Sequence, residues 1–270
     1  MSYTTFFPTT FNLLVRPFTN RIKLGEGGLL ILNFTHSVAS SKPYALIILE
    51  TVISFLVLCV LYGYNDYTDV EKDKFNPKKD PDFIKLVSDN YTLFLNLIIA
   101  VQFLTISVAF IFLSWHTALY MVVLYAINFL YSHKVKSIPL ADIVIVSFWG
   151  GLYICLSGYF RWEISLAAGL MVGIAHFFQV ITDKDSDKKN SVSTSAVVLI
   201  GWENLLLFIL CTALAFVLYL ITNDVILAAI GFLPFMFYFL SKRVTFSWYM
   251  SRFLFFILWL LILKKVYAGI

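Results

Sequence analysis

Charge is scarce in this sequence. Only 13% of its 270 residues are charged, whereas about a quarter of the residues in a soluble domain usually are. Hydrophobic residues make up 60% of the chain, aromatic residues make up 18%, and the mean hydropathy is +0.84. A soluble fold could not bury this much apolar surface, so the composition excludes a soluble globular protein. It predicts an all-α, polytopic membrane protein.

Cysteine is equally scarce. Cys59, Cys155 and Cys211 each lie inside an apolar run, and no two of them have the spacing of a metal site. We expect free thiols buried in the membrane. The chain also lacks a basic start followed by a small-residue cleavage site, so we expect no cleavable signal peptide. Residues 10–23 contain several basic side chains and are expected to form a cytosolic leader.

Nine apolar segments are candidates for membrane crossings. A spanning helix needs about 20 predominantly apolar residues, and the first and fourth segments are short by this measure. No soluble domain or low-complexity tract interrupts the series, so we expect residues 1–270 to form one transmembrane domain. The predicted spans are residues 27–41, 45–64, 91–114, 117–131, 140–160, 164–181, 196–221, 225–240 and 246–263.

The basic residues are distributed unevenly between the loops. If the N-terminus is cytosolic, most Lys and Arg residues fall in cytosolic loops, as the positive-inside rule requires. The sequence therefore predicts a cytosolic N-terminus and a C-terminus on the opposite side. The net charge of +4 lies between apolar runs, which favours lipid headgroups or an anionic substrate over nucleic acid. Outside the spans, the opposite side holds only Lys42, Arg161, Lys264 and Lys265.

A row of carboxylates follows the second predicted span. Asp66, Asp69 and Asp73 stand at i, i+3 and i+7, which places them on one face if the helix continues. Like charges this close destabilise a helix unless a cation neutralises them. Asn65 adds a neutral oxygen beside them. The pattern predicts a cation site at the end of this helix.

A second acidic cluster ends the sixth predicted span. Asp183 and Asp187 are at i and i+4, again on one face, and the predicted topology puts both clusters at cytosolic helix ends. A single acidic loop would most simply be a solvated loop. Two clusters on matching helix ends favour a shared site, because they can meet across one cavity mouth.

Two facing carboxylate clusters suit hard divalent cations. Mg2+ prefers oxygen ligands, commonly takes one or two carboxylates, and completes its shell with water and phosphate oxygens. The clusters therefore predict a site for Mg2+ and a diphosphate, with an apolar cavity below for an isoprenoid tail. Nearby lysines would neutralise the remaining phosphate charge. These are Lys134, Lys136, Lys184, Lys188 and Lys189.

These motifs resemble those of the UbiA superfamily of intramembrane prenyltransferases. Asn65-Asp66-x-x-Asp69-x-x-x-Asp73 is similar to the first aspartate-rich motif of the family, and Asp183-x-x-x-Asp187 resembles the second. The stretch YSHKVKSIPLAD, from residue 131, is similar to the Tyr-Ser/Thr and Lys stretch between the fourth and fifth helices of the family. The nine predicted spans also match, so the resemblance covers nearly the whole chain.

The first loop carries a further, more local likeness. The NPKK at residues 76–79 resembles the first loop of lycopene elongases in this superfamily. The family commonly has Arg where Lys78 and Lys79 stand, and often Gly where Asn190 stands. These departures bear on the prenyl-chain preference and the subfamily more than on the metal chemistry.

The resemblance implies nine helices around a central cavity and a definite chemistry. A prenyl group would move from an isoprenoid diphosphate to a lipophilic, typically aromatic, acceptor through an allylic carbocation, with Mg2+ as cofactor. The resemblance implies two ions: Asp66, Asp69 and Asp73 would bind one Mg2+ with Asn65 assisting, and Asp183 and Asp187 would bind another. The implied catalytic residues are Asp66, Asp69, Asp183, Asp187, Lys134 and Lys136. The expected substrate contacts are Asn65, Tyr131, Lys78, Lys79, Gln179, His176, Asn128 and Asn33.

Several of these polar residues lie deeper in the predicted spans. His176 and Gln179 are seven and four positions before Asp183, so they share its face and are candidates to position an acceptor or to take the lost proton. An interhelical hydrogen bond is the competing interpretation. Asp142, just inside the fifth span, is open between a functional and a structural role. The same alternatives hold for Tyr62, Asn128, Asn33 and His36.

Two other functions fit part of the pattern. A UbiA-type terpene cyclase shares the metal clusters, but the double bonds of the substrate itself capture the cation and no acceptor is needed. A cation-coupled transporter would place carboxylates near the bilayer midplane, often at broken helices. Here the carboxylates cluster at helix ends on one side, which disfavours a transporter.

Overall fold

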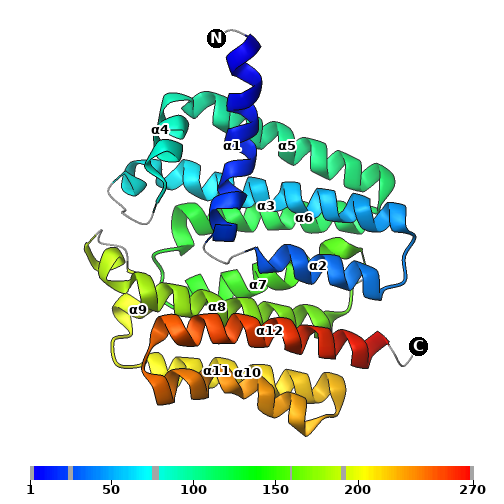
Figure 1. The fold of residues 1–270 in the computed structure, drawn as a ribbon, viewed down its shortest axis with the longest axis vertical. Helices are drawn as coiled ribbons and strands as arrows, with labels where there is room; N and C mark the ends of the chain where they lie inside the picture. The colour runs from blue at the N-terminus through cyan, green and yellow to red at the C-terminus, as the bar shows by residue number, and fades with distance from the viewer. Residues whose placement is uncertain (1–2, 24–26, 75–78, 159, 190–192, 268–270) are drawn as a thin grey trace.

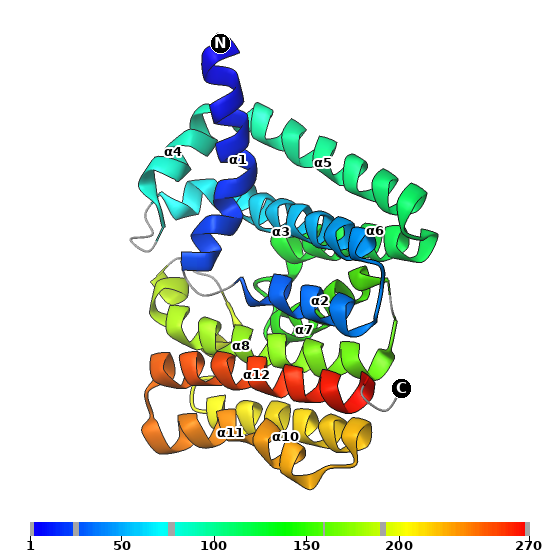
Figure 2. The same cartoon turned by 45° about the vertical axis from the view of Figure 1, so that its right-hand side comes forward.

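The computed structural model describes residues 3–23, 27–74, 79–158, 160–189 and 193–267, and these residues form helices and connections with no β-strand. The described residues include nine apolar helices that run roughly side by side (Figure 1; Figure 2). They are α2 (Gly28–Ala39), α3 (Tyr44–Asp73), α5 (Tyr91–Phe112), α6 (Trp115–Leu130), α7 (Ala141–Ile154), α8 (Trp162–Lys189), α10 (Glu203–Thr222), α11 (Val225–Ser241) and α12 (Val244–Tyr267).

Each of the nine helices overlaps one predicted span. Five of them, α3, α5, α8, α10 and α12, are long and apolar enough to cross a membrane, whereas α2, α7 and α11 are apolar but shorter. The number of crossings therefore stays a prediction. Cys59, Cys155 and Cys211 are free and buried, as expected.

The prediction of an unbroken helix over residues 196–221 is wrong. A short helix α9 (Ser195–Val198) ends before a turn, and α10 begins at Glu203. Gly201 has φ +88°, which L-residues with a side chain rarely adopt and which breaks the helix. The Glu203 carboxylate accepts a hydrogen bond of 2.7 Å from the Gly201 amide and so fixes the turn.

The expected leader is a helix. Helix α1 (Tyr3–Lys23) runs roughly perpendicular to the bundle and packs on α3 and α5 (Figure 1; Figure 2). A second helix outside the predicted spans, α4 (Pro81–Asp89), begins where Asp80 accepts hydrogen bonds from the amides of residues 82 and 83. Arg16 of α1 pairs with Asp80 at 3.0 Å, so these two helices are joined at the end of the bundle where α3 stops.

Helices α7 and α8 pack with their backbones close together. A Cβ atom on Gly169 would lie 2.5 Å from the carbonyl oxygen of Ser147, and one on Gly151 would lie 2.7 Å from that of Ser165. Only glycine fits at such distances, and small residues at helix interfaces are typical of membrane bundles. The close packing fixes the start of α7 beside the last turns of α8.

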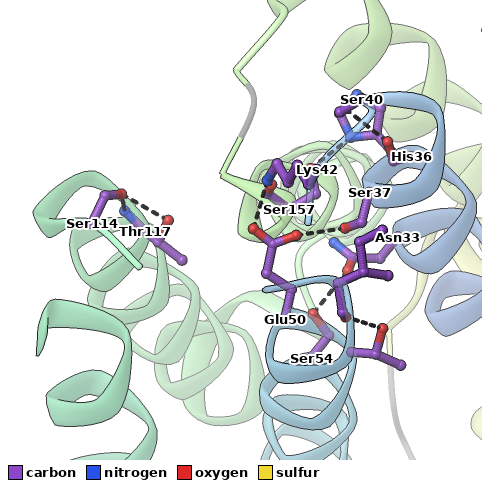
Figure 3. A network of polar contacts seen from close by, with 12 residues as sticks. Asn33, His36, Ser37, Ser40, Lys42, Glu50, Ser54, Ser114, Thr117 and Ser157 are labelled. Atoms are coloured by element: carbon purple, nitrogen blue, oxygen red, sulfur yellow. Dashed lines mark hydrogen bonds and ion pairs between the residues drawn. The ribbon is translucent and has the colours of Figure 1, made fainter. Parts of the chain in front are cut away.

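A buried polar network joins helices at the opposite end of the bundle (Figure 3). The Lys42 ammonium lies 2.5 Å from the carboxylate of Glu50 on α3, which also accepts a hydrogen bond of 2.8 Å from Ser37 on α2. Lys42 also donates to the carbonyl oxygen of Ser157 in the short helix η2 (Cys155–Ser157) that follows α7. His36 contacts the Ser157 hydroxyl at 2.6 Å. Glu50 is only 3% exposed, so its charge depends on these partners.

We predict that Glu50→Gln destabilises the protein by about 3 kcal/mol, because the change leaves the Lys42 ammonium buried without a counter-ion. Thermal unfolding in detergent would measure the loss. The matched control is Lys74→Gln, which removes an exposed pair with Glu71 and should change stability by less than about 0.5 kcal/mol. Equal stability of the two variants would contradict the prediction.

Candidate active site

A cavity of about 460 Å³ lies among α2, α3, α7, α8 and α12. The last turns of α3 and α8, which carry the two acidic motifs, lie at the same end of the bundle (Figure 1). The polar end of the cavity is lined by Asn65, Asp69, Asp73, Lys136, Asp183 and Asp187. Its other walls include Leu61, Ile145, Val146, Met171, Val172 and Phe255. The cavity therefore joins a charged mouth to an apolar interior.

Two carboxylates of the first motif face this cavity. Helix α3 continues to Asp73, which confirms that the helix runs through the motif. Asp69 is 5% exposed and forms an ion pair with Lys136. Asp73 pairs with Lys79 at 2.9 Å. Each carboxylate is thus neutralised by a lysine from another segment of the chain.

Asp66 faces a neighbouring pocket instead. It does not line the main cavity but a pocket of about 240 Å³ between α1, α3 and α4. It lies 3.0 Å from both Arg21 and Lys79. Arg21, Lys79 and Asp73 line both pockets. A spacing of three residues rotates Asp69 by about 60° from Asp66 around the helix axis, which accounts for the division.

The second motif lies across the cavity on α8. Asp183 and Asp187 both line the cavity, and Thr194 donates a hydrogen bond of 3.2 Å to Asp187 Oδ2. Lys184 points elsewhere and pairs with Glu203 at 2.7 Å. The prediction that the two acidic clusters share one cavity is therefore supported by the positions of Asp69, Asp73, Asp183 and Asp187.

The basic residues of the expected site are dispersed. Lys136 and Lys79 line the cavity, whereas Lys134 is exposed and is not among the lining residues. Lys188 is also exposed and away from the cavity wall. Lys78 lies outside the described residues. Sequence spacing could not tell which of Lys134 and Lys136 faces the cavity, because Lys134 lies in the π-helical turn η1 (Tyr131–Val135) and Lys136 follows it.

The donor set fits Mg2+ only together with phosphate. Among the described residues, no three His, Cys, Asp or Glu side chains gather closely enough to hold a metal. The expected set of Asp66, Asp69 and Asp73 around one ion is therefore not preassembled. Mg2+ commonly takes one or two carboxylates and fills its shell with water and phosphate oxygens. Hard oxygen donors on two facing helices suit an ion shared with a diphosphate, rather than one held by protein alone.

Two residues that line the cavity each have a buried polar atom without a partner in the described part of the chain. His176 Nε2 and Trp149 Nε1 are inaccessible to solvent and make no hydrogen bond within the described part of the chain. Both residues line the cavity, as does Gln179 one turn beyond His176. The Tyr131 ring, which also lines the cavity, lies 6.3 Å from the His176 ring. Buried polar groups are normally hydrogen-bonded, so these two residues are candidates to contact a ligand.

Other predicted polar residues join helices. Asn33 does not line the cavity: its amide donates to the Tyr153 carbonyl at 3.1 Å and accepts from Ser54 at 2.9 Å. His36 uses both ring nitrogens in hydrogen bonds, to Ser157 and Tyr267. Asn128 lines the cavity, but its Nδ2 donates to the carbonyl of residue 61. The structure thus gives Asn33 and His36 interhelical contacts and does not bring them to the site.

Three cavity residues were not singled out by sequence reasoning. Arg21 was counted only as a leader cation, yet its guanidinium lies 5.5 Å from the Tyr62 ring and reaches Asp66. Trp149 lies in an apolar run of a chain rich in aromatic residues, so its sequence position does not distinguish it. Thr194 lies seven residues after Asp187 but beyond the end of α8, so helical periodicity does not relate the two side chains. The only available signal was a basic residue shortly before an apolar run, in the case of Arg21.

The fold is similar to solved structures of UbiA homologues and of a digeranylgeranylglyceryl phosphate synthase. A UbiA homologue from Archaeoglobus fulgidus bound to DMAPP and Mg2+ matches with a TM-score of 0.71 at 16% identity, covering 96% of this chain and 98% of that one. A UbiA homologue from the same organism bound to GPP and Mg2+ gives 0.69 at 16% identity over the same shares. A digeranylgeranylglyceryl phosphate synthase gives 0.59 at 16% identity, covering 96% and 97%.

The comparison with curated proteins gave no match. The model of the UbiA prenyltransferase family, however, matches residues 30–263, which include both acidic motifs, all of α3, α7 and α8, and most of α2 and α12, but not α1. With the structural likeness over nearly the whole length, this match shows that the chain belongs to the UbiA prenyltransferase family.

Proposed function

We propose that residues 1–270 form one transmembrane domain that transfers a prenyl group from an isoprenoid diphosphate to a lipophilic, aromatic acceptor in an Mg2+-dependent reaction. One observation carries this proposal: both acidic motifs line the polar end of a single cavity whose remaining walls are apolar. A diphosphate with a hydrocarbon tail has the same division into a charged end and an apolar end. The relatives bound to DMAPP or GPP with Mg2+ support the assignment.

Each of the two motifs would hold one Mg2+ ion beside the diphosphate. Asp69 and Asp73, with Asn65 and Asp66, would contribute from α3, and the second motif from α8. When bound, Mg2+ supplies Lewis-acid stabilisation of the negative charge that develops on the departing diphosphate. The carboxylates of α3 are now paired with a lysine or arginine and would be balanced by the metal when it is bound.

The cations at the mouth suit the diphosphate. Lys136 and Lys79 line the cavity beside the first motif. An ammonium group forms charge-assisted hydrogen bonds with phosphate oxygens, which are stronger than neutral ones. The Tyr131 hydroxyl lies at the same end of the cavity and can donate a further hydrogen bond. These side chains would orient the diphosphate and hold its charge after the C–O bond breaks.

The apolar interior suits the carbocation that remains. Tyr62 and Trp149 line the cavity, and their ring centroids lie 6.5 Å apart. An aromatic face stabilises a desolvated cation by up to about 2 kcal/mol. The surrounding aliphatic side chains exclude water that would otherwise capture the cation.

The cavity also reaches the outer surface of the bundle. Ile31 of α2 and Phe256 of α12 line it, yet they are 49% and 40% exposed. Their helices are neighbours. In a membrane this surface faces lipid, so a lipophilic acceptor could enter between α2 and α12 without passing through water.

His176 and Gln179 are the proposed acceptor contacts. They lie about 10 Å and about 6 Å along α8 from Asp183, at the level where a carbon attached to the diphosphate would lie. An acceptor carbon forms the new bond with its own electron pair and then loses a proton. His176 Nε2, which has no partner among the described residues, can take that proton or bind a polar group of the acceptor.

We predict that Asp69→Ala and Asp187→Ala each lower turnover by about 100-fold or more, because each removes a metal ligand that stabilises the leaving group. EDTA should stop the reaction and Mg2+ should restore it. Radiolabelled geranyl diphosphate consumed by the purified protein is the measurement. Metal-independent turnover, or near-normal rates in both variants, would refute the two-motif scheme.

A matched lysine pair provides the control for this experiment. Lys136→Ala removes a cavity-lining ammonium and should raise the KM for geranyl diphosphate about tenfold. Lys134→Ala removes an exposed ammonium two residues away and should leave the KM within about twofold.

We predict that mass spectrometry will detect prenylated products when the protein is incubated with Mg2+, prenyl diphosphates of several lengths and a panel of aromatic acceptors. Without acceptor, product formation should fall to slow hydrolysis, because the cation then has no partner. A cyclic hydrocarbon or alcohol formed from the diphosphate alone would replace the transferase assignment with a UbiA-type terpene cyclase.

We also propose that the N-terminus and the cavity mouth are cytosolic and that the C-terminus is on the opposite side, because the predicted loops at the mouth's end of the bundle hold most of the Lys and Arg residues. A reporter fused after residue 270 should therefore give a non-cytosolic signal. A cytosolic signal would overturn the nine-span topology.

A further inference from the structure

Asp142 is a buried carboxylate that the proposed reaction does not use. It lies at the start of α7, is 1% exposed, and lines the cavity. Its Oδ2 accepts a hydrogen bond of 3.1 Å from the Ser195 amide, and its Oδ1 accepts from the Ser195 hydroxyl and from the Ile143 amide. A charge at this depth is normally tied to function or to a specific partner. Here most of its hydrogen bonds go to one serine.

Ser195 is held from a second direction. Its Oγ accepts a hydrogen bond of 2.7 Å from the Leu140 amide, two residues before Asp142. Leu140 has φ +68°, a conformation that residues other than glycine seldom adopt. Such a conformation persists only where surrounding contacts enforce it. The hydrogen bond to Ser195 therefore helps to hold the backbone in this conformation just before α7 begins.

The residue before Ser195 contacts the second acidic motif. Thr194 is 4% exposed, lines the cavity, and donates its hydroxyl to Asp187 Oδ2 at 3.2 Å. Three side chains thus connect α7 to the motif on α8: the Asp142 carboxylate fixes Ser195, and Thr194 beside it contacts Asp187.

Other contacts also hold α8 to its neighbouring helices. Lys184 and Glu203 already join the end of α8 to the start of α10 at 2.7 Å. Packing of α7 on α8 is set by the glycine contacts described above. The hydrogen bonds of Asp142, Ser195 and Thr194 are therefore not the only contacts that hold α8 to its neighbours, and they lead to one oxygen of the Asp187 carboxylate.

We propose that Asp142 is a positioning residue of the second acidic motif, acting through Ser195 and Thr194 to fix the orientation of the Asp187 carboxylate at the cavity mouth. This inference rests on the proposed role of Asp187 in Mg2+ binding. A carboxylate that is already oriented loses less rotational freedom when it takes a metal. Groups that orient metal ligands typically change metal affinity by 10- to 100-fold when removed.

The test is the Mn2+ affinity of the full-length protein in detergent, measured by electron paramagnetic resonance with geranyl S-thiolodiphosphate as an unreactive diphosphate. Mn2+ stands in for Mg2+ because it prefers the same oxygen ligands. We expect Asp142→Asn and Thr194→Val to weaken Mn2+ binding about tenfold. Ser195→Ala should do the same, and Ser195→Thr, which keeps the hydroxyl, should restore affinity to within about threefold.

The structural control is Ser54→Ala. It removes a buried serine hydroxyl that bonds Asn33 at the other end of the bundle. It should lower the thermal midpoint and leave Mn2+ affinity within about twofold. Thr194→Val is the mildest variant, because it keeps the Asp142–Ser195 contacts and the side-chain shape. Its monodispersity and thermal midpoint should match those of the wild type.

Two results would overturn the inference. The first is wild-type Mn2+ affinity in folded Asp142→Asn and Thr194→Val. The second is an equal loss of affinity in Ser54→Ala, which would make the effect one of stability. If the wild-type protein itself binds no Mn2+ with the diphosphate, the proposed function fails, and this inference fails with it. That outcome is distinguishable because it does not depend on any variant.

Discussion

Charge compensation at the edge of an apolar bundle is the constraint on which this structure depends. Carboxylates placed where helices leave the hydrocarbon region lose part of their hydration and must be balanced by nearby cations. Asp66, Asp69 and Asp73 are balanced by Arg21, Lys136 and Lys79, which come from three different segments of the chain. The acidic motif therefore organises its surroundings. It attaches α1, the loop before α4 and the turn after α6 to the end of α3.

Buried carboxylates are neutralised in different ways at the two ends of the bundle. At one end Glu50 pairs with Lys42, and hydrogen bonds to Ser37 and Ser157 surround the pair (Figure 3). At the other end the carboxylates line a cavity, and their lysine and arginine neighbours line it too. A buried ion pair such as Lys42–Glu50 stabilises the junction between helices. A pair on a cavity wall can be exchanged for a metal and a phosphate, because the alternative partners carry the same signs of charge.

Periodicity explains most of what the sequence predicts. The nine apolar segments each overlap a helix, and the spacing of Asp183 and Asp187 places both on the cavity wall because the helix between them is regular. Predictions are wrong or incomplete where regular helix ends. Gly201 breaks a helix inside an apolar run, and the π-turn separates Lys134 from Lys136. The contacts of Arg21 and Thr194 join residues far apart in sequence or on irregular backbone, so no spacing rule reveals them. Asn33 and His36 show a further limit. A polar side chain within an apolar span indicates that it makes a hydrogen bond, but the sequence does not indicate the partner.

Helix α1 has a practical consequence for work on this chain. The family match begins at residue 30, beyond the end of α1 at Lys23. A truncated version designed on the family boundary would keep every aspartate of both motifs and lose Arg21, which neutralises Asp66 and forms part of the wall of both pockets. Such a version would expose a carboxylate and open the cavity mouth while appearing complete by alignment. The domain boundary that the family match gives therefore differs from the boundary that keeps the partner of Asp66, which must include α1.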